Sequence, residues 1–244
     1  MDEGMTTSRP WEARTANLLG EDALRRLAQA RVLVVGIGGV GGYAAEILCR
    51  SSVGALTLVD ADSVAESNIN RQIIATQATV GQSKAILFAE RFHIINPDAS
   101  INAVNTFLTP DSVADLLAPG YDYVIDAIDT VAPKTALIAH CLLNNIPIIS
   151  SMGAGGRIDP TQVRYADLWE TREDGLARAV RQRLKKGGIK RSLKVVCSTE
   201  APRSHALIHL DERNKRSSFG TLASIPAIFG IYLANSVIRK ITKV

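Results

Sequence analysis

The sequence predicts an α/β fold: a doubly wound, mostly parallel sheet, with a C-terminal part that adds antiparallel strands and a final helix. Aliphatic runs alternate with helical stretches up to Ser150, which is the pattern of right-handed strand–helix–strand units. With 244 residues, 46% of them hydrophobic, the chain can bury one sizeable core. We therefore expect one domain over 1–244, composed of a core over 10–155 and a second part over 156–244.

The first predicted strand runs into a glycine turn. Residues 32–35 are aliphatic in a row, as in a parallel strand that is covered on both faces, and a helix is expected over about 42–52. Between them, Gly36, Gly38 and Gly41 have the spacing G-x-G-x-x-G, and Gly39 is a fourth glycine of the turn. Glycine lets the chain turn sharply here and brings backbone N–H groups to a phosphate at the start of a helix. This Rossmann-like unit suits NAD and ATP equally well.

Two acids follow the second predicted strand, 56–59. An acidic residue about 20 positions after such a glycine turn binds the hydroxyls of a ribose. Asp60 is the first candidate because it stands at the end of the strand, and Asp62 is the second. The alternative for each is a carboxylate that caps the next turn.

Cations further along the chain separate ATP from NAD. Asn68, Arg71 and Gln72 follow the two acids, and Lys84 lies on a helix that is expected to begin after Gly81. Two cations near one glycine turn suit a triphosphate, whose charge must be neutralised as pyrophosphate leaves. A dinucleotide needs neither cation. The alternative is that Arg71 and Lys84 are surface charges.

The third predicted strand, 123–129, brings another acid to the carboxyl edge of the sheet, where such folds bind ligands. Asp129 stands there, just before a helical stretch at about 131–143, and it could hold the Mg²⁺ that accompanies ATP. Asp126 is the weaker candidate, because within a strand it could instead be a buried, hydrogen-bonded acid.

Later segments are expected to extend and cover the sheet. We read 146–150 as a fourth major strand and 157–167 as a further strand and loop, and we expect 193–198 and 206–210 to be strands antiparallel to the core. Residues 221–241 are long and apolar enough to suggest a membrane span, but Pro226, Gly230 and several polar residues interrupt them. We predict instead a buried helix on the sheet or a helix of a dimer interface.

Basic residues are concentrated in one stretch, although the net charge is only +4. The stretch contains no acid and has the following cations: Arg178, Arg181, Arg183, Lys185, Lys186, Lys190, Arg191 and Lys194. Arg213, Lys215 and Arg216 follow later. Such a stretch can neutralise RNA phosphates, and the alternative is a solvated helix face and loop. It contains no aromatic residues that would stack on bases.

The chain has three cysteines, too few for a four-cysteine zinc site. Cys49 and Cys141 fall inside predicted helices and are expected to pack in the core, whereas Cys197 is either structural or a reactive thiol. Scattered cysteines suit a reducing compartment, and the N-terminal residues lack the apolar core of a secretory signal. We therefore expect a cytoplasmic protein without a membrane anchor.

Taken together, the glycine turn and the polar residues after it resemble the ubiquitin-activating-enzyme-like superfamily, which includes the adenylyltransferases of molybdopterin and thiamine synthesis. The resemblance implies that Arg71 and Lys84 contact the phosphates of ATP, that Asp60 contacts the ribose and that Asp129 binds the metal. It also implies a homodimer in which an N-terminal arginine, here Arg14, reaches into the partner's site.

Four further segments resemble one branch of that superfamily, the tRNA threonylcarbamoyladenosine dehydratases: 10–20, 121–129, 153–161 and 198–200. The branch implies that ATP activates the threonyl carboxylate of the modified adenosine, after which the side chain closes to a ring. The implied partners are tRNA carrying threonylcarbamoyladenosine and, as a candidate, a protein of the cysteine-desulfurase system. Some relatives carry a cysteine shortly before the position of Phe219, and this chain has none there.

Three other functions stay open at this point. The first is an adenylyltransferase that activates the C-terminus of a ubiquitin-like sulfur-carrier protein. The second is an NAD-dependent oxidoreductase, which would leave Arg71, Lys84 and Asp129 without a role. The third is an RNA-binding module without catalytic activity.

Overall fold

The computed structural model describes residues 9–212 and 215–244. Its main sheet contains β1 (Arg31–Val35), β2 (Ala55–Val59), β3 (Ser100–Val104), β4 (Tyr123–Asp126), β5 (Ile148–Ser151), β6 (Val163–Asp167) and β7 (Lys194–Ser198). The strand order is β3-β2-β1-β4-β5-β7-β6, and β6 is antiparallel to its neighbour β7. A separate antiparallel hairpin consists of β8 (Leu207–Glu212) and β9 (Lys215–Phe219). The doubly wound α/β fold is confirmed.

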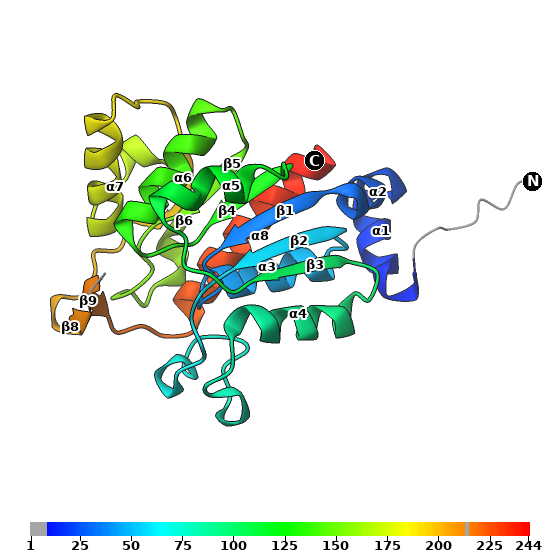
Figure 1. Ribbon diagram of the computed structural model, residues 1–244, viewed down its shortest axis with the longest axis horizontal. Coiled ribbons are helices and arrows are strands. Elements are labelled where there is room, and N and C mark those ends of the chain that lie inside the picture. The colour runs from blue at the N-terminus through cyan, green and yellow to red at the C-terminus, as the bar shows by residue number, and fades with distance from the viewer. Residues whose placement is uncertain (1–8, 213–214) are drawn as a thin grey trace, which may run out of the picture.

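Helices cover both faces of this sheet (Figure 1). One layer contains α2 (Glu21–Gln29), α3 (Gly41–Arg50), α4 (Lys84–Ile95) and α8 (Ser224–Thr242). The other contains α5 (Val113–Leu117), α6 (Val131–Leu143) and α7 (Gly175–Lys186). The short helix α1 (Ala13–Leu19) precedes α2, and single 3₁₀ turns occupy several connections.

The aliphatic run of β1 explains why the sheet is covered twice. Val32 and Val34 point into the core beneath α3, α4 and α8, whereas Leu33 and Val35 point into the core beneath α5, α6 and α7. All four side chains are buried. A strand whose two faces are both apolar can be buried only between two layers of helices, so the pattern and the packing agree.

Three strands differ from expectation. Residues 193–198 were expected to run antiparallel to the core, but β7 is parallel to β5, because α7 returns the chain to the amino edge before β7 begins. Residues 206–210 lie in the separate hairpin and do not pair with the core. The edge strand β3 was not predicted, because its side chains are exposed or half-buried and it lacks a buried aliphatic run.

The final helix was predicted correctly as a packed element. Its buried side, which includes Phe229 and Leu233, lies in the same core as α3. A Cβ atom at Gly230 would lie 2.4 Å from the carbonyl oxygen of Val40, so glycine permits α8 to approach the end of the glycine turn closely. Within the described residues, no helix is both long and apolar enough to cross a bilayer.

Candidate nucleotide-binding site

The glycine turn between β1 and α3 is formed by close backbone contacts. Gly36 has φ +82°, and a Cβ atom there would lie 2.8 Å from the carbonyl oxygen of Ala127. A Cβ atom at Gly41 would lie 1.8 Å from the carbonyl oxygen of Gly36, which no side chain permits. The chain therefore turns within van der Waals contact of the end of β4 and delivers the N-terminus of α3 to the carboxyl edge of the sheet, where backbone N–H groups can bind a phosphate.

Asp60 is anchored beside this turn. Its Oδ2 accepts a hydrogen bond from the backbone N–H of Ile37 at 2.9 Å, and its Oδ1 accepts one from Asp62 N–H at 2.9 Å. Burial raises the pKa of Asp60, and the charge of Lys84 opposes that effect. The carboxylate thus joins β2 to the glycine turn, which is the place expected for a ribose ligand.

Lys84 is a buried cation and not a surface charge. It is 4% exposed as the first residue of α4, and its Nζ lies 2.9 Å from Oδ2 of Asp62. The Asp62 side chain is 70% exposed, so the pair has one solvated member. This arrangement gives Asp62 a partner, whereas its predicted contact with the ribose stays a prediction.

Arg71 and Gln72 lie against the glycine turn. A Cβ atom at Gly39 would lie 3.4 Å from Cγ of Arg71, and one at Gly38 would lie 3.5 Å from Nε2 of Gln72. Asn68 is buried, and its backbone carbonyl accepts hydrogen bonds from the N–H groups of Arg71 and Gln72 at 3.0 and 2.9 Å. The structure therefore brings the segment 68–72 against the glycine turn, as the sequence predicted.

Gln72 has an unsatisfied polar atom, which indicates a bound ligand. The residue is 7% exposed, and its Oε1 is buried without a hydrogen-bond partner among the described residues. A buried polar atom without a partner is unfavourable unless a bound group satisfies it. Because Gln72 contacts Gly38, a donor on a nucleotide bound at the turn would be within its reach.

The charge of Asp129 acts on the guanidinium of Arg71. Burial lowers the pKa of Arg71, and the negative charge of Asp129 opposes that effect. The Arg71 guanidinium also donates to the carbonyl oxygen of Ser67 at 2.8 Å. Asp129 does not lie in a strand, because β4 ends at Asp126 and the chain leaves the sheet there. The predicted strand 123–129 was therefore too long, although Asp129 stands at the carboxyl edge as expected.

The loop that carries Asp129 rests on a buried charge network. Asp126 and Lys134 are both 0% exposed, and Lys134 Nζ lies 2.8 Å from Oδ2 of Asp126. Lys134 also donates to the carbonyl oxygen of Ile128 at 2.9 Å, and Ser150 Oγ donates to Asp126 Oδ2 at 2.6 Å. Asp126 is thus the buried, hydrogen-bonded acid of the alternative interpretation. Sequence reasoning missed Lys134, although a single cation in an otherwise apolar helix was a usable signal.

A buried arginine shapes the loop after β5. Arg157 is 3% exposed and donates through Nε to the carbonyl oxygen of Glu200 at 2.9 Å, and through Nη1 to that of Gly153. Asp174 accepts from the N–H of Gly153 at 2.9 Å and caps α7 by accepting from Ala177 N–H at 2.8 Å. The start of α7 is therefore tied to the carboxyl edge of the sheet. No sequence signal assigned a role to Arg157 beyond its place in a glycine-rich run.

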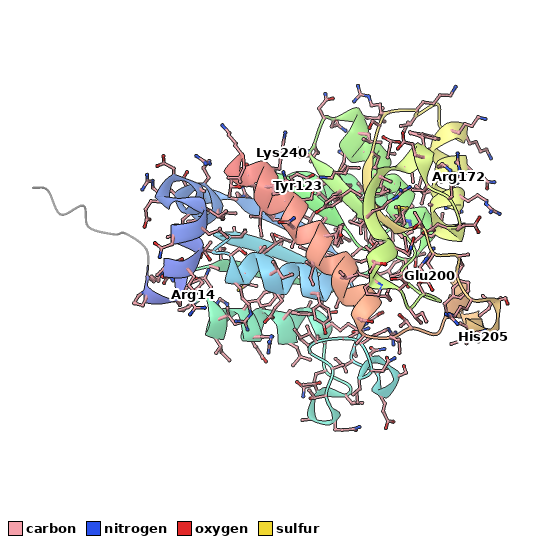
Figure 2. All side chains as sticks on the ribbon, turned by 180° about the vertical axis from the view of Figure 1, so that it is seen from behind. Arg14, Tyr123, Arg172, Glu200, His205 and Lys240 are labelled. Atoms are coloured by element: carbon pink, nitrogen blue, oxygen red, sulfur yellow. The ribbon has the colours of Figure 1, made fainter. Side chains whose placement is uncertain are left out.

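Arg14 lies away from the carboxyl edge of the sheet. It lies exposed on α1, and α2 leads from there into the amino end of β1 (Figure 1). Figure 2 shows Arg14 at the opposite end of the molecule from Glu200 and His205. A contact of Arg14 with a glycine turn would therefore have to be made in another copy of the chain, and the predicted homodimer stays a prediction.

The three cysteines are buried. Cys49 packs in α3 and Cys141 in α6, and burial raises the pKa of each thiol to about 12. This confirms their predicted place in the core. Cys197 lies in β7, where burial also raises its pKa, so the structural interpretation is favoured over a reactive thiol.

Comparison with known proteins agrees with this geometry. The chain belongs to the ThiF family, whose model matches residues 12–244. It is similar to tRNA threonylcarbamoyladenosine dehydratase of Escherichia coli (strain K12), at 46% identity over 251 residues that cover 94% of each chain. The crystal structure of the E. coli tRNA N6-threonylcarbamoyladenosine dehydratase in complex with ATP matches with a TM-score of 0.88 and 44% identity, over 97% of this chain and 96% of that chain.

The likeness to the activators of carrier proteins is narrower. Molybdopterin-synthase adenylyltransferase of Salmonella typhimurium (strain LT2) is 41% identical over 140 residues, which cover 57% of this chain and 54% of that one. The resemblance to the tRNA threonylcarbamoyladenosine dehydratases is therefore confirmed along nearly the whole chain, whereas the resemblance to the adenylyltransferases covers little more than half of it.

Proposed function

We propose that the protein is an ATP-dependent tRNA threonylcarbamoyladenosine dehydratase that cyclises the modified adenosine through adenylation of its carboxylate. The observation that carries this proposal is a pair of cations at the glycine turn and its anchoring acid, in a chain that matches an ATP-bound dehydratase over 97% of its length. Arg71 lies against Gly39, and the charge of buried Lys84 acts on Asp60, which accepts a hydrogen bond from the turn. A dinucleotide-dependent oxidoreductase has no use for these cations.

The residues present fit ATP and its metal. The backbone of the glycine turn and the start of α3 would hold phosphate, Asp60 would hold the ribose, and the unsatisfied Oε1 of Gln72 would accept a hydrogen bond from the nucleotide. Asp129 would hold Mg²⁺, an ion that usually binds through one or two carboxylates plus the phosphates of the substrate. When bound, the ion would supply positive charge to phosphate oxygens.

The proposed reaction has two steps. The threonyl carboxylate attacks the α-phosphorus of ATP, and the bond from that phosphorus to the bridging oxygen of the β-phosphate breaks. Arg71 and Lys84 stabilise the pyrophosphate that leaves. An atom of the carbamoyl group then attacks the adenylated carbonyl carbon, loses its proton and expels AMP. The nucleoside loses the elements of one water, and the protein contributes mainly position and charge.

Other parts of the proposal concern the assembly. Residues 10–155 form the ATP-binding core, and 156–244 form the part that binds tRNA and contributes to dimerisation. The homodimer would place Arg14 of one copy near the pyrophosphate in the partner's site, which is supported by the position of Arg14 on α1, ahead of α2 and the amino end of β1. We place the protein in the cytoplasm, where its tRNA substrate occurs, and retain a cysteine-desulfurase-system protein as a candidate partner.

The test is release of AMP from labelled ATP with tRNA that carries threonylcarbamoyladenosine, compared with unmodified tRNA. We expect AMP only with the modified tRNA, together with loss of one water from the nucleoside by mass spectrometry. Arg71→Ala and Lys84→Ala should abolish AMP release, whereas Arg25→Ala, an exposed cation on α2, should not. Near-normal AMP release by both site variants would contradict the assignment.

Two other outcomes identify the alternatives. AMP formation that depends on a small carrier protein and not on tRNA would favour the adenylyltransferase. Tight NADH binding without ATP binding would favour the oxidoreductase.

A further inference from the structure

The solvent-facing side of α7 and the turn after it are uniformly basic. Residues 175–194 contain no Asp or Glu. Ala177, Val180 and Leu184 form the buried side of the helix. Like charges three or four positions apart destabilise a helix. These cations therefore repel one another along the exposed side, and a bound anion would relieve that repulsion.

The structure separates structural cations in this stretch from those that face solvent. Three cations serve the fold: Arg181 donates to the carbonyl oxygen of Leu168 at 3.1 Å, Lys194 donates to Ser236 Oγ at 2.9 Å, and Arg191 donates to the carbonyl oxygen of Leu142. The cations that remain define the α7 surface: Arg178, Arg183, Lys185, Lys186 and Lys190. All of them are exposed, and none forms an ion pair with a carboxylate within residues 9–212 and 215–244. Arg213 lies outside the described residues.

The α7 surface begins at the carboxyl edge of the sheet, the edge that carries the candidate site. Asp174, the cap of α7, is bonded to Gly153 in the loop after β5, and α7 packs against α6, whose first turn follows Asp129. At 1.5 Å per residue, the 12 residues of α7 extend about 18 Å from that point. Figure 2 shows nitrogen-tipped side chains projecting outward from this helix, near the labelled Arg172.

We infer that the α7 surface binds the phosphate backbone of the substrate tRNA while the modified nucleoside occupies the nucleotide site. The inference rests on the proposed function and names the surface that holds its substrate. One strand of a DNA duplex carries a phosphate for about every 3.4 Å of helix axis, so on that scale a surface of about 18 Å along the axis spans about five phosphates. Because the surface carries no aromatic residue, it positions the RNA through charge and does not read bases.

The test compares two variants that each lose three positive charges. The first, Arg178→Gln/Lys185→Gln/Lys186→Gln, alters the α7 surface. The control, Arg25→Gln/Lys240→Gln/Lys243→Gln, alters exposed cations on α2 and at the end of α8. Binding of tRNA that carries threonylcarbamoyladenosine is measured over a series of salt concentrations, and ATP binding and thermal unfolding are measured alongside.

We expect the first variant to bind tRNA about 10- to 100-fold more weakly at moderate salt, with a slope of log K against log salt that is shallower by about 2. Its KM for tRNA should rise while kcat at saturating tRNA and the affinity for ATP stay unchanged. The control should bind tRNA as the wild type does. Equal weakening of both variants, or no weakening of the first, would overturn the inference and leave the proposed function standing. A wild-type protein that binds no tRNA would overturn both.

Discussion

Replacing Lys134 by methionine tests whether a buried charge network supports the loop at the candidate site. The substitution keeps the apolar stem of the side chain and removes the Nζ that lies 2.8 Å from Asp126 Oδ2 and 2.9 Å from the carbonyl oxygen of Ile128. Asp126 then remains fully buried without its cation. Its remaining donors are the N–H of Ile128 at 3.1 Å and the hydroxyl of Ser150 at 2.6 Å.

The expected loss of stability follows from this geometry. Removing one partner of a buried ion pair costs about 3–5 kcal/mol, because the other charge is left uncompensated. For a chain of this size each kcal/mol lowers Tm by about 2–4 °C, so Tm should fall by about 6–20 °C. Urea unfolding at neutral pH measures the loss directly. The affinity for ATP should fall as well, since the loop from Ile128 to Asp129 loses a hydrogen bond that holds it.

The double variant Asp126→Asn/Lys134→Met separates an unpaired charge from a lost packing contact. Asparagine carries no charge and can still accept from Ile128, so the double variant should recover most of the stability that the single variant loses. The reasoning is refuted if Lys134→Met unfolds within about 1 kcal/mol of the wild type, or if the double variant is as unstable as the single one.

Three further predictions concern other parts of the chain. Burial would raise the pKa of Glu46, but hydrogen bonds from Arg91 and Arg50 outweigh it and hold the pKa below its ordinary value of 4.5. Glu46 therefore contributes stability that is present above that value and is lost as the pH falls through the folded-state pKa. In urea unfolding, the wild type should exceed Glu46→Gln in free energy of unfolding by the full amount at pH 7 and by less in acid. A difference in free energy that grew in acid would contradict this. Gly41→Ala should lower Tm and abolish ATP binding, because its Cβ would lie 1.8 Å from the carbonyl oxygen of Gly36, and unchanged ATP binding would refute the tight turn. The three buried thiols are those of Cys49, Cys141 and Cys197. A disulfide reagent at pH 8 should modify them only after denaturant is added, and rapid reaction of the native protein would show that at least one of them is accessible.

Local patterns predicted most of the parts that form the candidate site. The glycine turn, the helix that begins at Lys84 and the helix that follows Asp129 were all placed correctly, because each depends on spacing and backbone preferences within a few residues. The apolar run of β1 also predicted a strand that is covered on both faces. The expected contacts of these residues with ATP remain predictions that the proposed experiments test.

Only the tertiary structure decided the features that depend on contacts between distant segments. It set the direction of β7, which neighbouring strands determine, and it showed Lys84 to be a buried cation. It also revealed the ion pair of Asp126 with Lys134 and the link from Asp174 to the loop after β5. The physical reason is that burial and pairing are properties of the packed chain: the same lysine is a solvated charge or a buried partner according to what the fold brings beside it.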